Sequence, residues 1–537
     1  MTRTTVDDAR PEEGAAPSVL AGPVAELPGG TLVDAVEANV RSRPDAVAVE
    51  GDAPALSYAE LWANAARIAA VLVDAGVTGG DQVAIWATRT APVVAGALAV
   101  MALGGTYMPI DPTYPPARVR RILEVGRPRA ILCADPHALA AGVPRSVAIV
   151  DTHAGSHVET ELRSAAQPAD VAYTVFTTGS TGLPKGVLVS HRSLLNYLGW
   201  AQELTDFHEG DSTPCFASLG FDHAVTCLWL PLMVGGSVQL IPDSWDPRPW
   251  IAPRERPYAF VKITPSHVRL FERMARPDYR SITRSVMFGG ERLDAALVAG
   301  MAERLDGVRL LNHYGPTEAT VGCTACRFDL ASVLEAPTGA LPIGVPAWNS
   351  RAYVVGSDLR PVPMGHEGEL VLGGACVAEG YLGGDDDDRS RFMDESALAA
   401  TAGLAGASRA YRTGDRTVVR DGQLHYLGRL DEQVKVRGHR IEIHEVRDLA
   451  TSVPGVAHAD AAVIPTGLGG LELFVVPAQG EEEGLVARVV ERLRAELPAA
   501  AVPERVRIVP NLVVNAHGKW DVEATRALAD QAEREHR

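Results

Sequence analysis

Helical and extended segments alternate along this chain from about residue 29 to residue 340. Leu56 to Val77 has the apolar spacing of a long amphipathic helix with Ser57 as its cap, and Gln82 to Ala87 reads as a buried strand. The alternation recurs through four later extended segments: Val147–Val150, Val238–Pro242, Val286–Phe288 and Val308–Asn312. Strands separated by helices predict an α/β fold with mainly parallel, doubly wound sheets.

The pattern changes after about residue 340 to short β-rich pieces such as Arg351–Gly356 and Glu369–Gly373. A charged segment near residues 428–431 then leads into a further α+β stretch. We therefore expect a disordered N-terminus over residues 1–28 and a large N-terminal domain with a β-rich subdomain over 29–428. A small, mobile C-terminal domain is expected over 429–537. The run Asp385–Asp388 is predicted to be a solvated loop.

Composition excludes several classes of protein. The 537 residues carry a net charge of −17, which disfavours nucleic-acid binding. Cys323 and Cys326 form one CxxC pair with no second pair at zinc spacing. Ala91 to Ile110 is uncharged and long enough to cross a bilayer, but Gly104 and Gly105 interrupt it, so a buried helix and a turn are expected. Without a signal peptide, we expect a cytoplasmic protein.

The segment Thr177–Gly186 places small hydroxyl and glycine residues directly after a predicted strand and ends in Pro184, Lys185 and Gly186. Such residues let backbone N–H groups approach an anion, and Lys185 adds positive charge. The spacing differs from that of the ordinary P-loop. Taken alone, the segment would favour a flexible surface loop.

Further motifs follow in a fixed order: Asn312–Glu318, Tyr411–Asp415, Gly428–Gly438 and Gly518–Lys519, with Leu56–Leu61, Gly105–Pro115 and Gly368–Gly373 between and before them. Together they resemble the adenylate-forming superfamily, and most closely the amino-acid-activating adenylation domains of nonribosomal peptide synthetases. The resemblance covers about residues 30–525. It implies an ATP- and Mg²⁺-dependent ligase that forms an aminoacyl-AMP.

The resemblance also assigns roles to residues. Lys519, Glu318 and Lys185 would be catalytic, with Glu318 holding Mg²⁺ and Lys519 stabilising charge as the substrate carboxylate attacks the α-phosphate. Tyr314 would pack on adenine and Asp415 would bind the ribose hydroxyls. The ATP- or AMP-binding set implied is Thr177, Thr178, Gly179, Ser180, Thr181, Gly182, Asn312, Tyr314, Gly315, Thr317, Asp415, Tyr426 and Arg429.

Asp431 corresponds to the hinge of the family, about which the C-terminal domain reorients between two half-reactions. In the second half-reaction, a phosphopantetheine thiol of a carrier protein takes the acyl group. His444 stands where the family usually has Gly and would crowd the approach of the thiol. His517 replaces the usual Asn before Gly518-Lys519 and leaves Lys519 intact.

Asp222 corresponds to the residue that binds the α-ammonium group in amino-acid-activating members; its alternative role is to cap a helix. The substrate pocket implied is Asp222, His223, Thr226, Lys262, Met287, Gly289, His313, Val321, Gly322 and Lys519. Within this set, five residues resemble the pocket pattern of aspartate-activating domains: Thr226, Lys262, Gly289, His313 and Gly322. His223 departs from the expected Leu, so a β-substituted aspartate also fits.

Lys262 is informative without the resemblance, because it lies in the apolar segment Ala259–Ile263. A buried ammonium group needs an anionic partner. That partner would be an acidic substrate side chain, with His223 and His313 as further donors whose protonated forms an anion would favour, or else an acid of the protein itself. Asparagine is the closest competing substrate, but its neutral amide would leave the Lys262 charge unmatched.

The chain contains no carrier module, so we expect a free-standing enzyme that loads a separate carrier protein, with an MbtH-like protein as a possible helper. Two alternatives remain. An acyl-CoA synthetase of the same fold is disfavoured by Asp222. A non-catalytic relative would not need Lys185, Glu318, Asp415 and Lys519 together.

Overall fold

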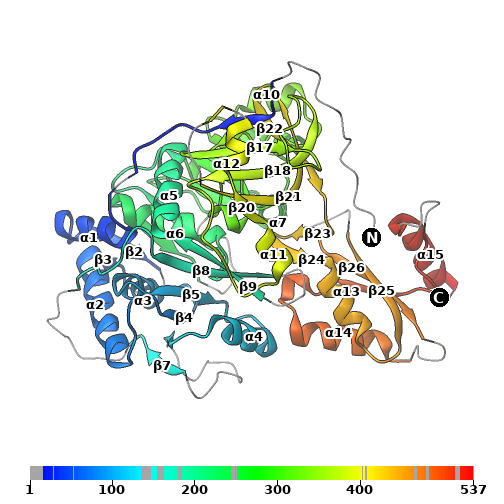
Figure 1. Cartoon of the computed structure of the whole chain (residues 1–537), viewed down its shortest axis with the longest axis horizontal. Coiled ribbons are helices and arrows are strands. Elements are labelled where there is room, and N and C mark those ends of the chain that lie inside the picture. Colours follow the sequence, from blue (N-terminus) through cyan, green and yellow to red (C-terminus); the bar gives the residue numbers. More distant parts are fainter. Residues whose placement is uncertain are drawn as a thin grey trace.

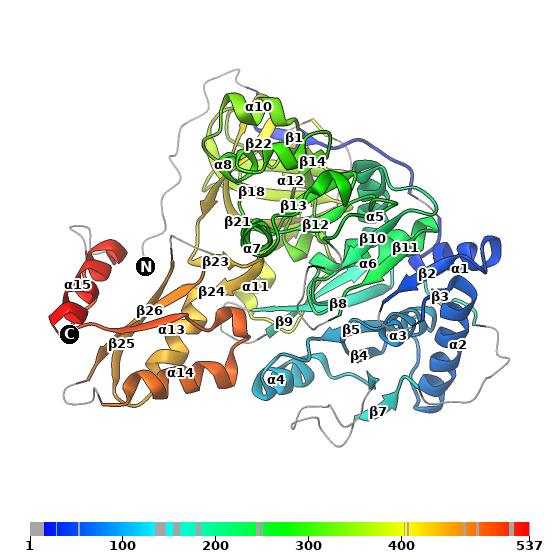
Figure 2. The ribbon, with the colours of Figure 1, turned by 180° about the vertical axis from the view of Figure 1, so that it is seen from behind.

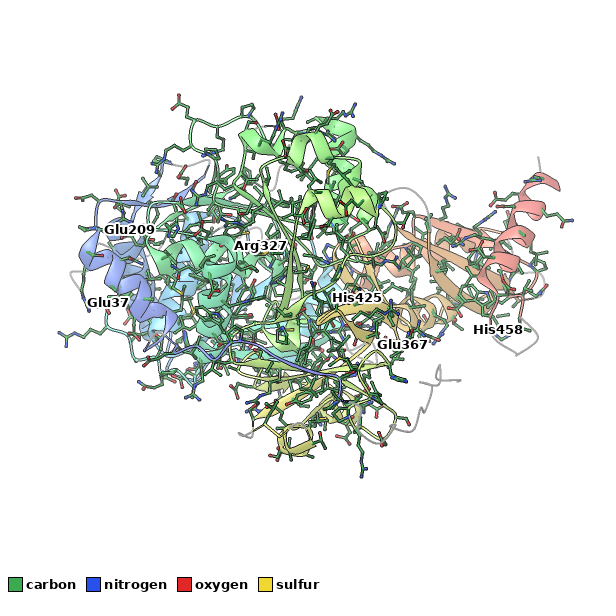
Figure 3. All side chains as sticks on the ribbon, turned by 90° about the horizontal axis from the view of Figure 1, so that it is seen from above. Glu37, Glu209, Arg327, Glu367, His425 and His458 are labelled. Carbon is green, nitrogen blue, oxygen red and sulfur yellow. The ribbon has the colours of Figure 1, made fainter. Side chains whose placement is uncertain are left out.

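The computed structural model describes residues 16–27, 29–51, 54–134, 147–153, 162–178, 184–242, 248, 251–401, 403–404, 408–464, 469–478, 483–514 and 520–535. A large body of sheets covered by helices carries a smaller group of C-terminal elements that extends to one side (Figure 1). Figure 3 shows the same long axis from above, from Glu37 at one end toward His458 at the other. The fold class is α/β, with a large N-terminal part and a smaller C-terminal part.

The largest sheet has the strand order β19-β9-β8-β5-β4-β6-β7. Its strands are β4 (Gln82–Trp86), β5 (Thr106–Ile110), β6 (Ala130–Cys133), β7 (Ala148–Asp151), β8 (Val171–Thr178), β9 (Pro184–Ser190) and β19 (Gly380–Leu382). Strands β4 to β8 pair in parallel, whereas β9 and β19 are antiparallel. The predicted parallel pairing therefore holds in the centre and ends where β8 turns directly back into β9.

A second sheet, in the order β12 to β16, begins with three parallel strands and ends with two antiparallel ones. Its strands are β12 (Val261–Ile263), β13 (Ser285–Gly289), β14 (Arg309–Tyr314), β15 (Thr324–Phe328) and β16 (Val345–Pro346). A small sheet beside it has β10 (Ser212–Cys215), β11 (Ser237–Leu240), β2 (Val47–Glu50) and β3 (Leu56–Ser57).

The β-rich region after residue 340 is an antiparallel six-stranded sheet. Its strands are β1 (Val19–Ala21), β17 (Ser350–Val355), β18 (Glu367–Gly374), β20 (Phe392–Asp394), β21 (Arg409–Arg420) and β22 (Gln423–Arg429). The C-terminal elements are the hairpin β23 (Gln433–Val436) and β24 (His439–Glu442), then α13 (Ile443–Thr451), β25 (Val456–Val463), β26 (Leu471–Pro477), α14 (Leu485–Glu496), β27 (Arg505–Ile508) and α15 (Val522–Glu535).

The remaining helices are α1 (Leu32–Ser42), α2 (Tyr58–Asp74), α3 (Ala91–Ala102), α4 (Pro116–Gly126), α5 (His191–Thr205), α6 (His223–Val234), α7 (Pro265–Met274), α8 (Ala295–Ala299), α9 (Ala302–Leu305), α10 (Leu330–Glu335), α11 (Asp386–Ser390) and α12 (Ser396–Thr401). The Ser57 cap is confirmed: the Ser57 hydroxyl accepts from the Glu60 N–H and the Glu60 carboxylate accepts from the Ser57 N–H. This capping box fixes the start of α2.

The uncharged stretch Ala91–Ile110 forms α3, a turn at Gly104 with φ of 73°, and β5. Helix α3 packs between α2 and strands β4 and β5 and is buried on every side, which is why its apolar character shows no face. Within the described part of the chain, no helix is long and apolar enough to cross a membrane.

The prediction of a solvated loop at Asp385–Asp388 is wrong. The segment caps and begins α11, and although Asp386 and Asp387 are exposed, Asp388 is buried. A buried carboxylate requires a partner. Its partner is a lysine of the candidate site.

Candidate active site

Strand register brings the sequence-predicted pocket residues onto one face of the second sheet. Lys262 pairs with Met287 across β12 and β13, and Gly289 pairs with His313 across β13 and β14. Because side chains two residues apart on a strand share a face, Met287 and Gly289 lie on the same side. Thr226 on α6 faces Lys262 from the opposite wall, at hydrogen-bonding distance. The structure thus gathers residues from four separate elements.

The loop after β14 closes one side of this pocket. Thr320 and Val321 have φ of 52° and 66°, and Gly322 follows them. A side chain at Gly322 would be impossible, because its Cβ would lie 2.0 Å from the Nε2 atom of His313. Gly322 therefore gives the His313 ring its space.

Lys262 is 1% exposed, and its contacts decide between the two predicted partners. Its Nζ atom donates to Thr226 Oγ1 at 2.8 Å and lies 3.5 Å from Tyr197 Oη. No carboxylate of the described residues forms an ion pair with it. Burial lowers the pKa of Lys262 to about 8, opposed by Cys227 and Asp222. The interpretation in which a protein acid neutralises Lys262 is thus not supported by the residues around it.

His223 and His313 lie beside Lys262 as predicted, but they are neutral here. Burial and the charge of Lys262 hold the pKa of both imidazoles well below the usual value. His223 Nε2 lies 3.3 Å from the Lys262 carbonyl oxygen, so this nitrogen is the donor. The His313 ring stacks on Trp200, with centroids 5.8 Å apart. Of Lys262 and the two imidazoles, Lys262 therefore carries the positive charge.

Asp222 immediately precedes α6 and is 8% exposed. Its side chain makes no capping hydrogen bond, so the helix-capping role does not explain it. Burial raises the pKa of Asp222, while the Thr317 hydroxyl and Lys262 oppose that shift. Asp222 therefore places a carboxylate at one end of the pocket, and Lys262 places a positive charge at the other.

A cavity of about 570 Å³ adjoins this pocket, between the second sheet and the β23–β24 hairpin. Its lining includes Asn312, His313, Tyr314, Tyr426, Arg429 and Lys435. The Tyr314 and Tyr426 rings lie 6.4 Å apart, and the Tyr314 hydroxyl donates to Asp415. The Asn312 amide donates to the Pro342 carbonyl at 2.7 Å and so orders the wall.

Asp415 is held by charge as well as by Tyr314. Arg429 Nη1 donates to Asp415 Oδ1 at 2.8 Å, and Arg429 Nη2 donates to Asp431 Oδ2 at 2.6 Å. Arg391 also contacts Asp431, at 3.3 Å. The Arg429 guanidinium group therefore links Asp431, the predicted hinge residue, to Asp415, the predicted ribose-binding acid.

Glu318 is completely buried beneath the hairpin. Arg440 Nη1 lies 3.0 and 2.9 Å from its two carboxylate oxygens, and the Tyr381 hydroxyl donates to Oε1 at 2.5 Å. Burial alone would raise the pKa of Glu318, but Arg440 and Lys185 outweigh it and lower the pKa to about 2. A carboxylate with both oxygens engaged fits Mg²⁺ only after Arg440 has withdrawn.

Lys185 is also committed to a protein partner. Its Nζ atom lies 2.6 Å from Asp388 Oδ1, with both side chains 2% exposed, and 4.4 Å from the Tyr381 ring centroid. Burial and Arg440 lower the pKa of Lys185, while Glu318 and Asp388 oppose this. The Lys185–Asp388 pair therefore lies against the ring of Tyr381, whose hydroxyl donates to Glu318. Of the predicted phosphate loop, Gly179, Ser180, Thr181 and Gly182 and the side chain of Thr178 lie outside the described residues.

Replacing Asp388 by Asn is expected to lower the free energy of unfolding by about 3 kcal/mol, because it leaves a buried ammonium group unpaired. Urea denaturation at pH 7 measures this. Asp386→Asn on the same helix is the control, since Asp386 is fully exposed. The double variant Lys185→Met/Asp388→Leu should recover most of the loss, and an Asp388→Asn protein as stable as the parent would contradict the assignment.

The other predicted C-terminal residues divide between described and undescribed segments. His517, Gly518 and Lys519 lie outside the described residues. Trp520, which follows Lys519, packs on Phe474 of β26 with ring centroids 5.9 Å apart. Figures 1 and 2 place α15, the next helix, at the outer end of the C-terminal part, whereas β23 and β24 lie near α7. The hairpin, and not α15, thus covers the site here.

His444 is the second residue of α13, directly after β24. Its Nδ1 atom is 3.9 Å from Glu442 Oε2, and its buried Nε2 atom has no hydrogen-bond partner among the described residues. Crowding of an incoming thiol by this side chain remains a prediction.

Sequence reasoning missed four residues that the structure adds to the site: Tyr197, Tyr381, Asp388 and Arg440. Arg440 carried a signal, because it lies in the charged segment after Gly438. Tyr197 carried none, since α5 is distant in sequence from the pocket strands. Helix packing alone brings its hydroxyl to Lys262 and Thr226.

Comparisons with known proteins identify the family and the fold. The family of AMP-binding enzymes matches residues 36–382, and the C-terminal domain of AMP-binding enzymes matches residues 445–519. Bacitracin synthase 3 of Bacillus licheniformis is 32% identical over 93% of this chain, which spans only 8% of that protein. Syringomycin synthase SyrB1 of Pseudomonas syringae pv. syringae is 34% identical over 92% of this chain and 81% of that protein.

The fold recurs in a solved structure of an artificially fused adenylation–PCP di-domain nonribosomal peptide synthetase from Klebsiella oxytoca. The TM-score is 0.77 at 23% identity, over 90% of this chain and 94% of the other. At this identity the likeness concerns the fold alone.

Proposed function

Because this chain belongs to the family of AMP-binding enzymes and is an AMP-forming ligase, we propose that it activates an acidic α-amino acid as its aminoacyl-AMP. L-aspartate or a β-substituted aspartate is the substrate that the pocket favours. The single observation that carries this proposal is Lys262, a buried cation whose described contacts are hydroxyl groups and not a carboxylate. A substrate carboxylate would supply the missing charge.

Binding of the amino acid follows from the charges at the two ends of the pocket. Asp222 would accept hydrogen bonds from the α-ammonium group, and Lys262 would pair with the side-chain carboxylate, with His313 as a further donor. Met287, Gly289, Val321 and Gly322 would shape the space between them. Asparagine would present a neutral amide to Lys262 and leave its charge unpaired.

ATP would occupy the adjoining cavity. Tyr314 and Tyr426 would pack against adenine, and Asp415, held by Arg429, would accept hydrogen bonds from the ribose. The segment from Thr177 to Gly182 would face the phosphates, together with Gly315 and Thr317. Glu318 would hold Mg²⁺, which neutralises phosphate charge when bound.

In the first half-reaction, an oxygen of the substrate α-carboxylate attacks the α-phosphorus. The bond to the bridging oxygen breaks and pyrophosphate leaves. Lys519 would stabilise the charge that develops on the carboxylate and α-phosphate. It would reach them by rotation of the C-terminal domain, residues 429–537, about Asp431 against the core of residues 29–428.

In the second half-reaction, a phosphopantetheine thiol of a carrier protein would attack the acyl carbon, form the thioester and release AMP. The position of the hairpin supports this step. Arg440 of β24 contacts both oxygens of the Glu318 carboxylate, so Glu318 would not hold Mg²⁺ in this arrangement. The two half-reactions would then use Glu318 with alternative cationic partners. The carrier acts in trans in this proposal.

The test is amino-acid-dependent ATP–pyrophosphate exchange with the common amino acids plus β-methyl- and β-hydroxyaspartate. Strong exchange with aspartate or a β-substituted relative supports the proposal. Exchange only with an apolar or neutral amino acid keeps the enzyme class and contradicts the acidic substrate. Silence across the panel, with CoA-dependent turnover of a carboxylic acid, would favour an acyl-CoA synthetase.

A further inference from the structure

We propose that Tyr197 is a positioning residue that fixes the hydrogen-bond donors of the pocket and thereby makes it select a carboxylate over a carboxamide. This inference rests on the proposed function, because it concerns how the same pocket distinguishes aspartate from asparagine. Tyr197 lies on α5, is 1% exposed, and belongs to none of the sequence motifs.

The Tyr197 hydroxyl is the meeting point of three polar side chains. It forms a short hydrogen bond with Thr226 Oγ1, lies 3.5 Å from Lys262 Nζ, and lies 3.3 Å from His313 Nε2. The Tyr197 ring also contacts the His313 ring edge-on, with centroids 5.8 Å apart. The phenol thus connects the cation of the pocket to its neutral imidazole.

The direction of these hydrogen bonds is set by Lys262, because an ammonium group can only donate. Thr226 Oγ1 accepts from Lys262 at 2.8 Å. Tyr197 is the one remaining partner of the Thr226 hydroxyl recorded in the described part of the chain, so the Thr226 proton points to Tyr197 Oη. The Tyr197 proton is then left for His313 Nε2, and the order of donation is Lys262, Thr226, Tyr197, His313.

This order assigns the tautomer of His313. A neutral imidazole that accepts at Nε2 carries its proton on Nδ1. The Nδ1 atom lies 3.4 Å from the point that a Cβ atom on Gly289 would occupy, so the glycine leaves open space beside it. Trp200 and Gly322 hold the ring in this orientation. The pocket consequently offers two donors, Lys262 Nζ–H and His313 Nδ1–H.

Two donors suit a carboxylate, whose oxygens both accept. A carboxamide has one accepting oxygen and one donating nitrogen. Its N–H groups would face one of the two pocket donors, and neither donor would have an acceptor. Without the Tyr197 hydroxyl, His313 is free to move its proton to Nε2. Nδ1 then becomes an acceptor, and the pocket can accommodate the amide nitrogen of asparagine.

The experiment is Tyr197→Phe, with kcat/KM for aspartate and for asparagine measured by ATP–pyrophosphate exchange. The ratio of kcat/KM for aspartate to that for asparagine is expected to fall by about tenfold or more, the effect of losing one buried hydrogen bond. KM for ATP should not change. If the Tyr197 hydroxyl had only a packing role, its removal would lower kcat/KM for both substrates equally and leave the ratio unchanged.

Tyr279→Phe is the matched control. Tyr279 is 2% exposed and its hydroxyl has no hydrogen-bond partner among the described residues, so the ratio should not change. The ring ¹⁵N chemical shifts of His313 in the parent protein should show its proton on Nδ1, and this measurement tests the inference if Tyr197→Phe does not fold; a proton on Nε2 overturns it. An unchanged ratio in a folded Tyr197→Phe protein overturns the inference. A parent enzyme that does not use acidic amino acids overturns the proposed function as well, and does so before any variant is made.

Discussion

Lys262→Met is expected to lower kcat/KM for aspartate by roughly two to three orders of magnitude, because it removes the buried cation opposite the substrate carboxylate. Methionine fills a similar volume without charge, so the pocket should keep its shape. ATP–pyrophosphate exchange with aspartate and asparagine measures the effect. Asparagine should lose much less, since it carries no charge for Lys262 to neutralise.

The same residue predicts the pH dependence. The pKa of Lys262 is lowered to about 8 in the protein without substrate, and only the protonated form attracts a carboxylate. Therefore kcat/KM for aspartate should be constant below that pH and fall as the pH rises through about 8. Asparagine carries no side-chain charge, so its kcat/KM should not show this fall. In Lys262→Met, the pH profiles for aspartate and asparagine should therefore be the same. Undiminished aspartate activity in the variant would contradict the assignment of Lys262.

Lys519→Ala is expected to abolish adenylate formation, with a loss of about a thousandfold in exchange, while ATP binding is mostly retained. The reason is that Lys519 would act on charge developing in the transition state, whereas Tyr314 and Asp415 would supply the adenine and ribose contacts. Exchange measures the first property and calorimetric ATP titration the second. An unchanged thermal unfolding midpoint is the control for folding, and full turnover in this variant would refute the role.

The sequence predicted the fold well where local pattern and tertiary packing agree. Ser57 has a capping partner three residues away, and the alternation of β4, β5 and β6 with helices required parallel pairing. It failed at Asp388, because a run of four acids looks solvated unless one knows what faces it. The opposing charge, Lys185, lies 203 residues earlier in the chain.

The candidate site divides in the same way. Motif order and residue chemistry singled out Glu318, Asp415 and Lys262 without coordinates, because each of them is marked by the residues next to it in the sequence. The sequence did not show which side chains contact these residues. Arg440 reaches Glu318 across 122 residues and Tyr197 reaches Lys262 across 65, and neither pair shares a motif.

The sequence by itself therefore determined that this chain has an α/β adenylate-forming fold and that Lys262 needs a partner, because burial of a charge is costly wherever the segment packs. The tertiary structure decided that hydroxyl groups surround Lys262, that Glu318 is held by Arg440, and that Lys185 is paired with Asp388. Such choices depend on which elements pack together. Interaction energies between side chains depend on distance in space, and a single sequence does not specify that distance for residues far apart in the chain.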